Sequence, residues 1–360
     1  MLSLYLHIPF CRQKCAYCAF YSAPAKRDLC VRYAHTLERA VRHFGQAEGR
    51  PLATLYFGGG TPALLGGEHL TRLILQSRAS FGFEDQMEIT VELNPESTDP
   101  SLLQALHQAG VNRVSLGVQS LCDRELARLG RLHTRQKALQ ALRDIFEAGF
   151  CNVSADVMYG LPGQTAESFE DTLDTLLAFP LTHLSAYSLQ LEEGTPLFRQ
   201  GVRPMAEERE ETLYRLLCEK AGQAGFLHYE ISNFARHGQV SRHNFAYWRR
   251  TDYLGLGPAA HSFLRGVRYH YEADTEKFLL HPLQLRNSEK IGPEEAWFEQ
   301  VMLGLRTSEG IPLSLLPAGL ALSRYQDFSI IKDGRFCLNE RGFYLSNAII
   351  AEILAKEQTK

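Results

Sequence analysis

Over residues 1 to 190, short apolar runs that favour strands alternate with longer stretches of helical periodicity. The predicted strands are Leu2–His7, Leu52–Phe57, Glu88–Glu92, Arg113–Gly117, Asn152–Met158 and His183–Leu189. The predicted helices between them are Cys30–Phe44, Leu70–Phe81, Ser101–Ala109, Arg135–Ala148 and Glu167–Ala178. Such alternation is typical of βαβ units around a parallel sheet. Six units are too few for the eight-unit barrel, so we expect an α/β fold with an incomplete (βα)6 barrel.

Length and composition restrict the class of protein. The chain has 360 residues, of which 45% are hydrophobic and 22% charged, as in an ordinary soluble protein with one large and one smaller domain. The net charge of −3 provides no basic field for nucleic acid. No apolar run is long enough to span a membrane, and the first strand leaves no room for a signal peptide. Since the eight cysteines are scattered apart from an opening triplet, we expect a cytoplasmic protein.

That triplet follows the first predicted strand. Cys11, Cys15 and Cys18 are spaced C-x3-C-x2-C, too close to one another to lack a common partner. Iron–sulfur clusters are normally held by four thiolates, so three would leave one iron open to another ligand. A disulfide would leave one thiol over, and structural zinc usually needs four ligands, for which His7 is a candidate. Spacing alone leaves these alternatives open.

Together with Tyr17, the triplet reads C-x3-C-x-aromatic-C, which resembles the motif of the radical S-adenosylmethionine (SAM) superfamily. The longer string YLHIPFC…KCAYC resembles the oxygen-independent coproporphyrinogen III oxidase family within it. The resemblance implies a radical SAM barrel and a [4Fe–4S] cluster on Cys11, Cys15 and Cys18. It also implies that the amino and carboxylate groups of SAM chelate the open iron, and that an electron from the cluster cleaves SAM to a deoxyadenosyl radical.

Further motifs stand near the ends of the predicted strands, where the catalytic groups of barrels collect. They are GGGTP after the second strand, VELNP, GVQS, RLGRLHT and the sequence before YGLPG. Taken singly, each polar side chain here is as well explained by a helix cap or a buried hydrogen-bond network. The resemblance assigns SAM binding to Tyr5, Tyr17, Gly58, Gly59, Gly60, Thr61, Glu92, Gln119, Arg131 and Asp156. It implies a contact at Gln190 that is largely through the backbone.

A second unusual string, His243-Asn-Phe-Ala-Tyr-Trp248, lies in the following region. One interpretation is a buried aromatic cluster that ties this region to the barrel. The other is a flat apolar site for haem, with His243 as the axial ligand, because HNxxYW resembles the motif of the haem-chaperone branch of the family. Arg249 and Arg250 would then pair with the haem propionates. We expect the Gly-rich segment Tyr253–Ser262 to turn over the mouth of the barrel.

The pattern predicts three parts: a barrel at 1–195, a barrel extension at 196–288, and a small winged-helix-like α+β domain at 289–360. In the third part we expect helices at Pro293–Arg306 and Ser346–Lys356, the latter capped by its serine. Between them, Phe328–Lys332 and Arg335–Leu338 flank Asp333-Gly334, which predicts a hairpin. Balanced charge favours a cover for the barrel over a DNA-binding module.

The resemblance also bears on activity. The decarboxylase branch has a further cysteine two places after the third cluster ligand, where this chain has Phe20, and a longer stretch before its first cluster cysteine. Both departures favour a chaperone that binds haem and delivers it to respiratory-chain haemoproteins or cytochromes, with no catalytic side chain assigned. The alternatives are oxygen-independent coproporphyrinogen III oxidation and a radical SAM enzyme acting on another tetrapyrrole. Delivery would involve peripheral membrane contact, although no strongly basic amphipathic helix is present, and a homodimer is left open.

Overall fold

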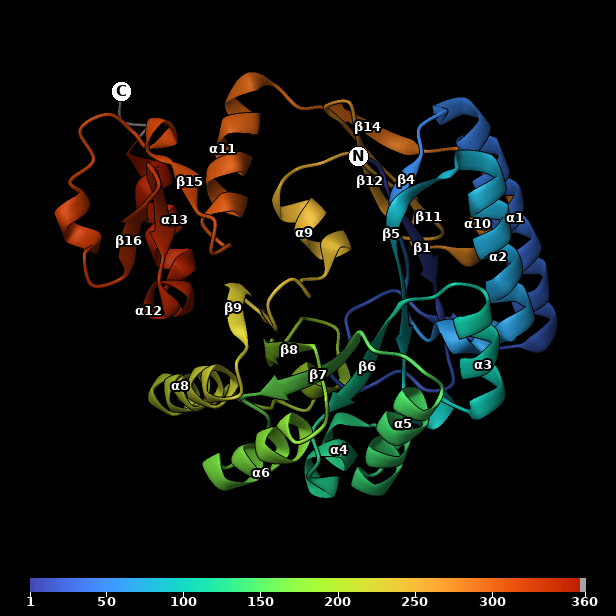
Figure 1. The fold of residues 1–360 in the computed structure, drawn as a ribbon, viewed down its shortest axis with the longest axis horizontal. Helices are drawn as coiled ribbons and strands as arrows, with labels where there is room; N and C mark the ends of the chain where they lie inside the picture. The colour runs from blue at the N-terminus through green and yellow to red at the C-terminus, as the bar shows by residue number, and fades with distance from the viewer. Residues whose placement is uncertain (357–360) are drawn as a thin grey trace.

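The computed structural model describes residues 1–356, and a twelve-stranded sheet forms its centre. The sheet curves as an open arc with helices along its outer side (Figure 1). The six predicted strands are neighbours in parallel order: β1 (Ser3–Ile8), β4 (Leu52–Gly59), β5 (Phe83–Leu93), β6 (Arg113–Gln119), β7 (Val153–Tyr159) and β8 (His183–Ser188). The outer helices are α1 (Arg27–Glu48), α2 (Gly66–Phe81), α3 (Pro100–Gln108), α4 (Asp123–Leu129), α5 (Arg135–Glu147) and α6 (Ala166–Leu177). The predicted incomplete (βα)6 barrel is confirmed.

The local sequence explains these elements. Strands such as β4 are buried along nearly their whole length, which requires continuous apolar runs rather than alternation. Three of the outer helices begin where a side chain accepts a backbone N–H of the first turn, namely Asp99 for α3, Thr134 for α5 and Thr165 for α6. Helix α4 was not predicted, because seven residues are too few to show helical periodicity.

Shorter elements complete the barrel and extend its sheet at both edges. Strands β9 (Leu227–Glu230) and β10 (Asn233–Ala235) follow β8, while β11 (Tyr253–Leu256), β12 (His261–Leu264), β13 (Val267–His270) and β14 (Arg286–Lys290) follow β1 on the other side. The remaining elements are β2 (Phe10–Cys11), β3 (Ala23–Pro24), α7 (Pro196–Arg199), α8 (Glu207–Gln223), α9 (Arg242–Trp248), α10 (Thr275–Leu280) and the 3₁₀ turns Pro62–Leu65 and Pro95–Ser97.

The expectation that Tyr253–Ser262 turns over the mouth of the barrel is wrong. This segment continues the sheet, since β11 pairs in parallel with β1 and β12 pairs antiparallel with β11. Its glycines permit close packing: a Cβ at Gly255 would lie 2.1 Å from the carbonyl oxygen of His261. Gly257 has φ of +117°, and a Cβ there would lie 2.6 Å from the hydroxyl of Tyr33.

The C-terminal part has a hydrophobic core of its own. Its elements are α11 (Pro293–Gly304), β15 (Ile311–Pro312), the 3₁₀ turns Leu313–Leu315 and Leu322–Tyr325, β16 (Ser329–Lys332), β17 (Arg335–Leu338), α12 (Glu340–Tyr344) and α13 (Ser346–Ala355). The hairpin turns at Asp333 and Gly334, both of which have positive φ. The predicted serine cap is wrong: α13 follows α12 directly, its N-cap is Leu345, and no side chain caps it. The three domain boundaries stay a prediction.

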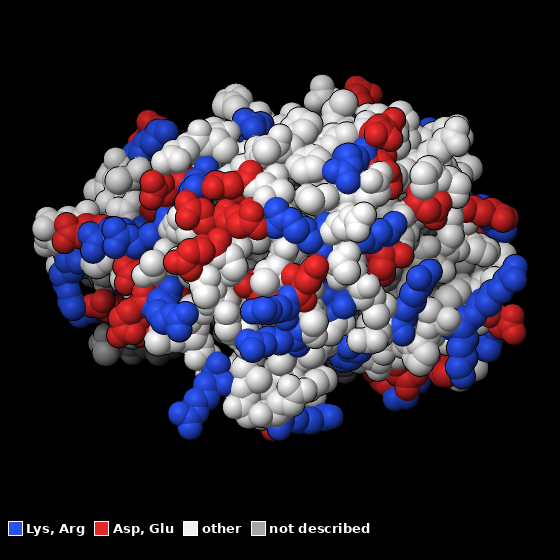
Figure 2. All heavy atoms as spheres, turned by 90° about the horizontal axis from the view of Figure 1, so that it is seen from below, with Lys and Arg blue, Asp and Glu red and all other residues white. Residues whose placement is uncertain are grey.

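Backbone hydrogen bonds join this part to the sheet. The amide of Ile231 donates to the carbonyl of Arg306 at 3.0 Å, and the amide of Ser308 donates to the carbonyl of Tyr229 at 2.9 Å. On the face in Figure 2, basic and acidic side chains are interspersed rather than gathered into one field. Across residues 1–356, no helix combines the length and apolar character that crossing a membrane demands.

Candidate cofactor site

A cavity of about 480 Å³ lies at the carboxyl ends of the barrel strands, and we call it the cofactor cavity. Of the residues predicted to bind cofactors, those in its lining are Cys11, Cys15, Tyr17, Cys18, Gly59, Gly60, Thr61, Glu92, Gln119, Arg131 and Asp156. Gln190 lines it as well. Tyr5, Gly58 and His243 are not among the lining residues. The structure therefore brings eleven of the fourteen predicted residues together, although they come from widely separated parts of the chain.

The cysteine loop is fixed to the barrel by its backbone. Cys11 ends β2, and the amide of Cys18 donates to the carbonyl of Cys15 at 3.2 Å in a turn. Ala16, between these cysteines, donates its amide to Leu129 and accepts the amide of Leu197, both at 2.9 Å. All three thiols are partly accessible. Burial and the neighbouring Cys18 raise the pKa of Cys11 to about 11, so this thiol is protonated near neutral pH until a metal binds.

The spacing of the three sulfurs distinguishes the metal groups considered above. Tetrahedral zinc would hold its sulfurs about 3.8 Å apart, given a Zn–S bond of about 2.3 Å. Within the described part of the chain, the triplet does not form a group whose ligand atoms all lie within 4.8 Å of one another. In an iron–sulfur cluster each thiolate binds a different iron, which requires wider spacing. Three thiolates that are not gathered at zinc-ligand distance suit a [4Fe–4S] cluster, in which each binds its own iron.

Glycines form the rim beside this loop. The amides of Gly60 and Thr61 donate to the carbonyls of Ile8 and Phe10, each at 2.8 Å, which brings the end of β4 against the start of the cysteine loop. A Cβ at Gly60 would lie 2.5 Å from the carbonyl oxygen of Phe10, closer than real contacts allow. Only glycine fits here, and its backbone is left open toward the cavity.

Glu92 presents a half-buried carboxylate on β5. It accepts the hydroxyl of Tyr56 at 2.8 Å and the amide of Gly59 at 3.1 Å. Burial raises its pKa to about 7; Asp156 adds to the rise, while the bond from Tyr56 opposes it. A carboxyl group poised near neutrality can accept a hydroxyl or a cationic amine from a ligand in the cavity.

Arg131 clamps several parts of the site together. Its guanidinium donates to Oδ1 of Asn94 at 2.6 Å, to the carbonyl of Gly117 at 2.9 Å and to the sulfur of Cys15 at 3.5 Å. Asn94 in turn donates to the hydroxyl of Thr61 at 3.0 Å. The sequence prediction missed Asn94, although it follows Glu92 by two positions in VELNP and such spacing places side chains on one face of a strand.

Two further predicted residues complete the far side of the cavity. Asp156 on β7 accepts the hydroxyl of Ser115 at 2.9 Å, and burial raises its pKa. Gln119 has φ of +65°, an unusual value for a residue other than glycine, at an irregularity in the pairing of β6 with β7. This backbone places Gln119 in the cavity lining. Lining residues that sequence reasoning missed also include Met158, Tyr187 and Ser188.

The opposite end of the barrel holds His243. Helix α9 packs against β4 there, and the amide of His243 donates to Glu88 at 3.0 Å. The imidazole is 1% exposed; its Nδ1 hydrogen-bonds to Thr54 at 2.7 Å and its Nε2 to Tyr247 at 2.8 Å. Both imidazole nitrogens are therefore hydrogen-bonded within the protein, and ligation of haem by His243 stays a prediction. The interpretation as a buried aromatic cluster describes this arrangement.

Other residues for which cofactor contacts were predicted also have partners within the protein. Tyr5 is half-buried, its hydroxyl bonds to Nδ1 of His7 at 2.9 Å, and it is not among the residues that line the cofactor cavity. Its contact with SAM stays a prediction. Arg249 and Arg250 form ion pairs with Glu309 and Glu299, which haem propionates would have to replace. These pairs connect the end of α9 to the C-terminal part of the chain.

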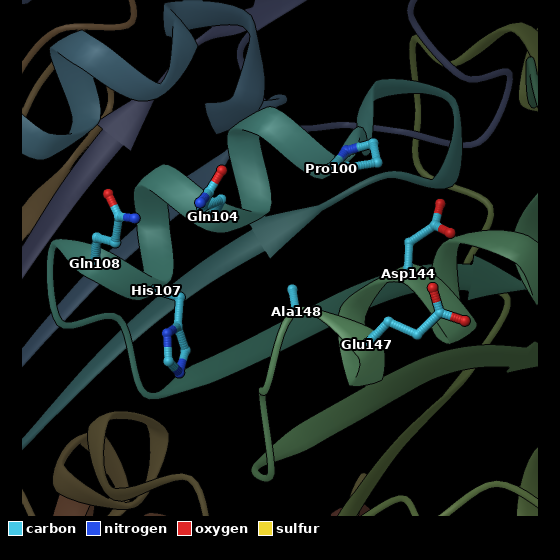
Figure 3. Close-up of a pocket in the computed structure, with 7 residues that line it drawn as sticks. All are labelled: Pro100, Gln104, His107, Gln108, Asp144, Glu147 and Ala148. Carbon is cyan, nitrogen blue, oxygen red and sulfur yellow. The ribbon is translucent and has the colours of Figure 1, made fainter.

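A second pocket, of about 460 Å³, lies outside the barrel between α3 and α5 (Figure 3). It shares no lining residue with the cofactor cavity. Its histidine, His107, packs edge-on against Phe150 with ring centroids 5.2 Å apart. Asp144 and Glu147 line the other side, on α5. We assign no function to this pocket.

Comparison with known proteins agrees with the geometry. Residues 5–176 match the family model of the radical SAM superfamily. The chain is 33% identical to the heme chaperone HemW of Mycobacterium tuberculosis over 98% of this chain and 94% of that protein. It is 36% identical to the mitochondrial radical S-adenosyl methionine domain-containing protein 1 of Bos taurus over 91% and 74%. The solved structure of coproporphyrinogen III oxidase (HemN) from Escherichia coli shares the fold, with a TM-score of 0.84 and 22% identity over 97% and 89%.

Proposed function

Since this chain belongs to the radical SAM superfamily and, within it, to the HemW family, we propose that it is a haem chaperone, which binds haem and delivers it to haemoproteins. The observation that carries this function is similarity to heme chaperones over almost the whole chain rather than over the barrel alone. The cofactor cavity adds a site suited to the [4Fe–4S] cluster and SAM of this superfamily.

Each part of the cofactor cavity has a role in this proposal. Cys11, Cys15 and Cys18 hold the cluster, and bound SAM supplies radical chemistry when the cluster reduces it. Glu92 and Asp156 accept hydrogen bonds from the hydroxyl and amino groups of SAM. The chain itself orients these groups through the Arg131 clamp and the glycine rim.

Phe20 supports the chaperone function over the decarboxylase. It lines the cofactor cavity, and its side chain is 70% exposed beside the cysteine loop. An exposed aromatic ring at the mouth offers apolar contact to a flat macrocycle without adding a redox group. The decarboxylase branch has a cysteine at this position, which this chain cannot supply.

We propose respiratory-chain haemoproteins or cytochromes as the recipients, and the cytoplasm as the compartment in which the chaperone is loaded. All eight cysteines are free thiols, as expected in a reducing compartment. The recipient class rests on the family resemblance. Haem transfer to an apocytochrome, followed by absorbance, tests it directly.

The test of haem binding is a haemin titration of the anaerobically reconstituted protein, with and without SAM. We expect one haem per chain and a saturable change in the haem spectrum. Absence of saturable binding in both conditions would reject the chaperone. Conversion of coproporphyrinogen to protoporphyrinogen at enzymic rates, with SAM and a reductant, would instead support the decarboxylase.

A further inference from the structure

Three metal-ligating side chains meet at the junction of the barrel and the C-terminal part of the chain. Cys218 comes from α8, His228 from β9 and Glu340 from the first turn of α12. The sulfur, one imidazole nitrogen and one carboxylate oxygen all lie within 4.8 Å of one another. None of the three lines the cofactor cavity, so this cluster is separate from the site described above.

His228 lacks hydrogen bonds that a buried imidazole normally makes. Both of its ring nitrogens are shielded from solvent, and neither has a hydrogen-bond partner within residues 1–356. The backbone of Glu230 and Ile231 lies close enough to influence its protonation but outside hydrogen-bonding geometry. Since buried polar atoms are nearly always bonded, two unpaired nitrogens on one ring indicate a partner that the protein atoms do not provide.

Packing fixes the imidazole in place. The ring stacks on Phe234 with centroids 4.0 Å apart and planes 16° apart, and Phe343 packs against it at 4.8 Å. A rigid orientation lowers the entropy lost when a ligand atom binds. Cys218 is buried beside it on α8, while the carboxylate of Glu340 is exposed and free to adjust.

The start of α12 is also held near α8. The hydroxyl of Tyr214 on α8 donates to the backbone carbonyl of Glu340 at 2.8 Å, and the Tyr214 ring packs against Tyr344 with centroids 5.1 Å apart. These contacts keep the Glu340 backbone within reach of Cys218, four residues after Tyr214 on the same helix.

We propose that Cys218, His228 and Glu340 bind one zinc ion at this junction. Thiolate, imidazole and carboxylate together suit zinc, whereas magnesium and calcium prefer oxygen ligands alone. Binding releases the thiol proton of Cys218 to solvent, and the thiolate and carboxylate then balance the charge of the ion. Tetrahedral bonds of about 2.0 to 2.3 Å require ligand atoms about 3.5 Å apart, so binding would draw the three atoms closer than the 4.8 Å that now bounds their separations. A water molecule takes the fourth position.

Such an ion would tie α12 of the C-terminal part to α8 and β9 of the sheet extension. The existing ties there are a few hydrogen bonds and aromatic contacts. Zinc would therefore fix how this part of the chain lies against the barrel, independently of haem.

The test uses the full-length protein with its cluster reconstituted, so that the cysteine loop is already occupied. After incubation with zinc sulfate and removal of excess metal, zinc per chain is measured by mass spectrometry and thermal unfolding by calorimetry. We expect one zinc per chain and a higher melting temperature. The C218A variant should bind zinc more than about 100-fold more weakly than the wild type. Loss of even a hydrogen-bond partner of a metal ligand lowers metal affinity by about 10- to 100-fold, and C218A removes a ligand itself.

Matched controls separate ligation from packing. C30A removes another buried thiol, from α1, and E294Q changes a carboxylate in the first turn of α11; both should bind zinc like the wild type. E340Q alters only an exposed group, so it remains informative if C218A fails to fold. We expect E340Q to lower the affinity for zinc at least tenfold. Zinc content that is zero in the wild type, or unchanged in both C218A and E340Q, would overturn the proposal.

Discussion

The two ends of the barrel use polar side chains in opposite ways. At the carboxyl ends of the strands, Glu92, Arg131 and the thiols converge on the cofactor cavity. At the amino ends, α9 packs across the base, and His243 bonds to Thr54 and Tyr247 within the protein. The mouth retains polar atoms for a ligand, whereas the polar groups around His243 bond to each other.

This difference separates residues that meet a cofactor from residues that support them. The ring of His243 stacks on Tyr56 with centroids 4.8 Å apart, and the hydroxyl of Tyr56 donates to Glu92. His243, at the amino ends of the strands, therefore helps to position the carboxylate of Glu92 in the cofactor cavity through the side chain of Tyr56. Ligation of haem by His243 would require α9 to move and one of the two hydrogen bonds of the imidazole to break.

The largest effect should follow loss of a thiol at the mouth. In C11A, we expect no stable [4Fe–4S] cluster, because two thiolates cannot hold it. Iron content and visible absorbance after reconstitution measure this. C151A, which removes an exposed cysteine outside the site, should reconstitute fully. A full complement of cluster iron in C11A would exclude the cysteine loop as its site.

The next largest effect concerns the glycine rim. In G60A, the new Cβ would overlap the carbonyl oxygen of Phe10. We therefore expect the free energy of unfolding to fall by about 4 kcal/mol and SAM binding to be lost. Denaturant unfolding and SAM titration measure these. The control is G222A, because Gly222 lies in α8 and a Cβ there would meet open space. This substitution should raise the free energy of unfolding by about 0.5 to 1 kcal/mol. Equal effects of the two substitutions would refute the steric argument.

Most residues of the cofactor cavity could be predicted from the sequence, because they belong to short sequence motifs. The strands ended close to their predicted positions, and barrel topology places groups at strand ends on one edge, which brings Glu92, Gln119 and Asp156 together. Asn94 escaped prediction because its role is to join Thr61 to Arg131, and only the folded chain shows that Arg131 is adjacent.

The base could not be predicted in the same way. The HNxxYW string is compatible with a ligand site or a packed cluster, and the choice depends on partners distant in sequence, such as Thr54 and Glu88. Tyr5 presents the same difficulty: alternation along β1 directs its side chain toward the interior, but the sequence does not show whether that side chain reaches the cofactor. Long-range pairing decides both cases.

Removal of the His243 side chain should have an intermediate effect on stability. In H243A, we expect a loss of about 3 kcal/mol in stability, from the cavity left and from the unpaired hydroxyls of Thr54 and Tyr247. Chemical denaturation measures this, and cluster content should be unchanged. If the folded variant keeps its cluster but no longer binds haem, then α9 opens and His243 is the ligand after all.

The smallest effect is a difference in pH dependence between the two ends. Burial raises the pKa of Glu92 to about 7 in the folded protein, against about 4.5 when unfolded. The folded state therefore binds more protons between these values, and its stability should fall by about 2 kcal/mol from pH 5 to pH 7 through this group.

His243 should act in the opposite direction. Burial, assisted by the charge of Arg113, lowers the pKa of His243 to about 3. The unfolded state then binds more protons below pH 6.5, so this group costs stability as the pH falls. Comparing the cluster-free wild type with cluster-free E92Q isolates the contribution of Glu92 to the pH dependence of stability, because Asp156 and Arg113 remain in both. We expect E92Q to gain stability relative to the wild type as the pH rises from 5 to 7. A difference that stays constant over this range would mean that the carboxyl group of Glu92 is already ionised at pH 5, and that the mouth is more open to water than its burial indicates.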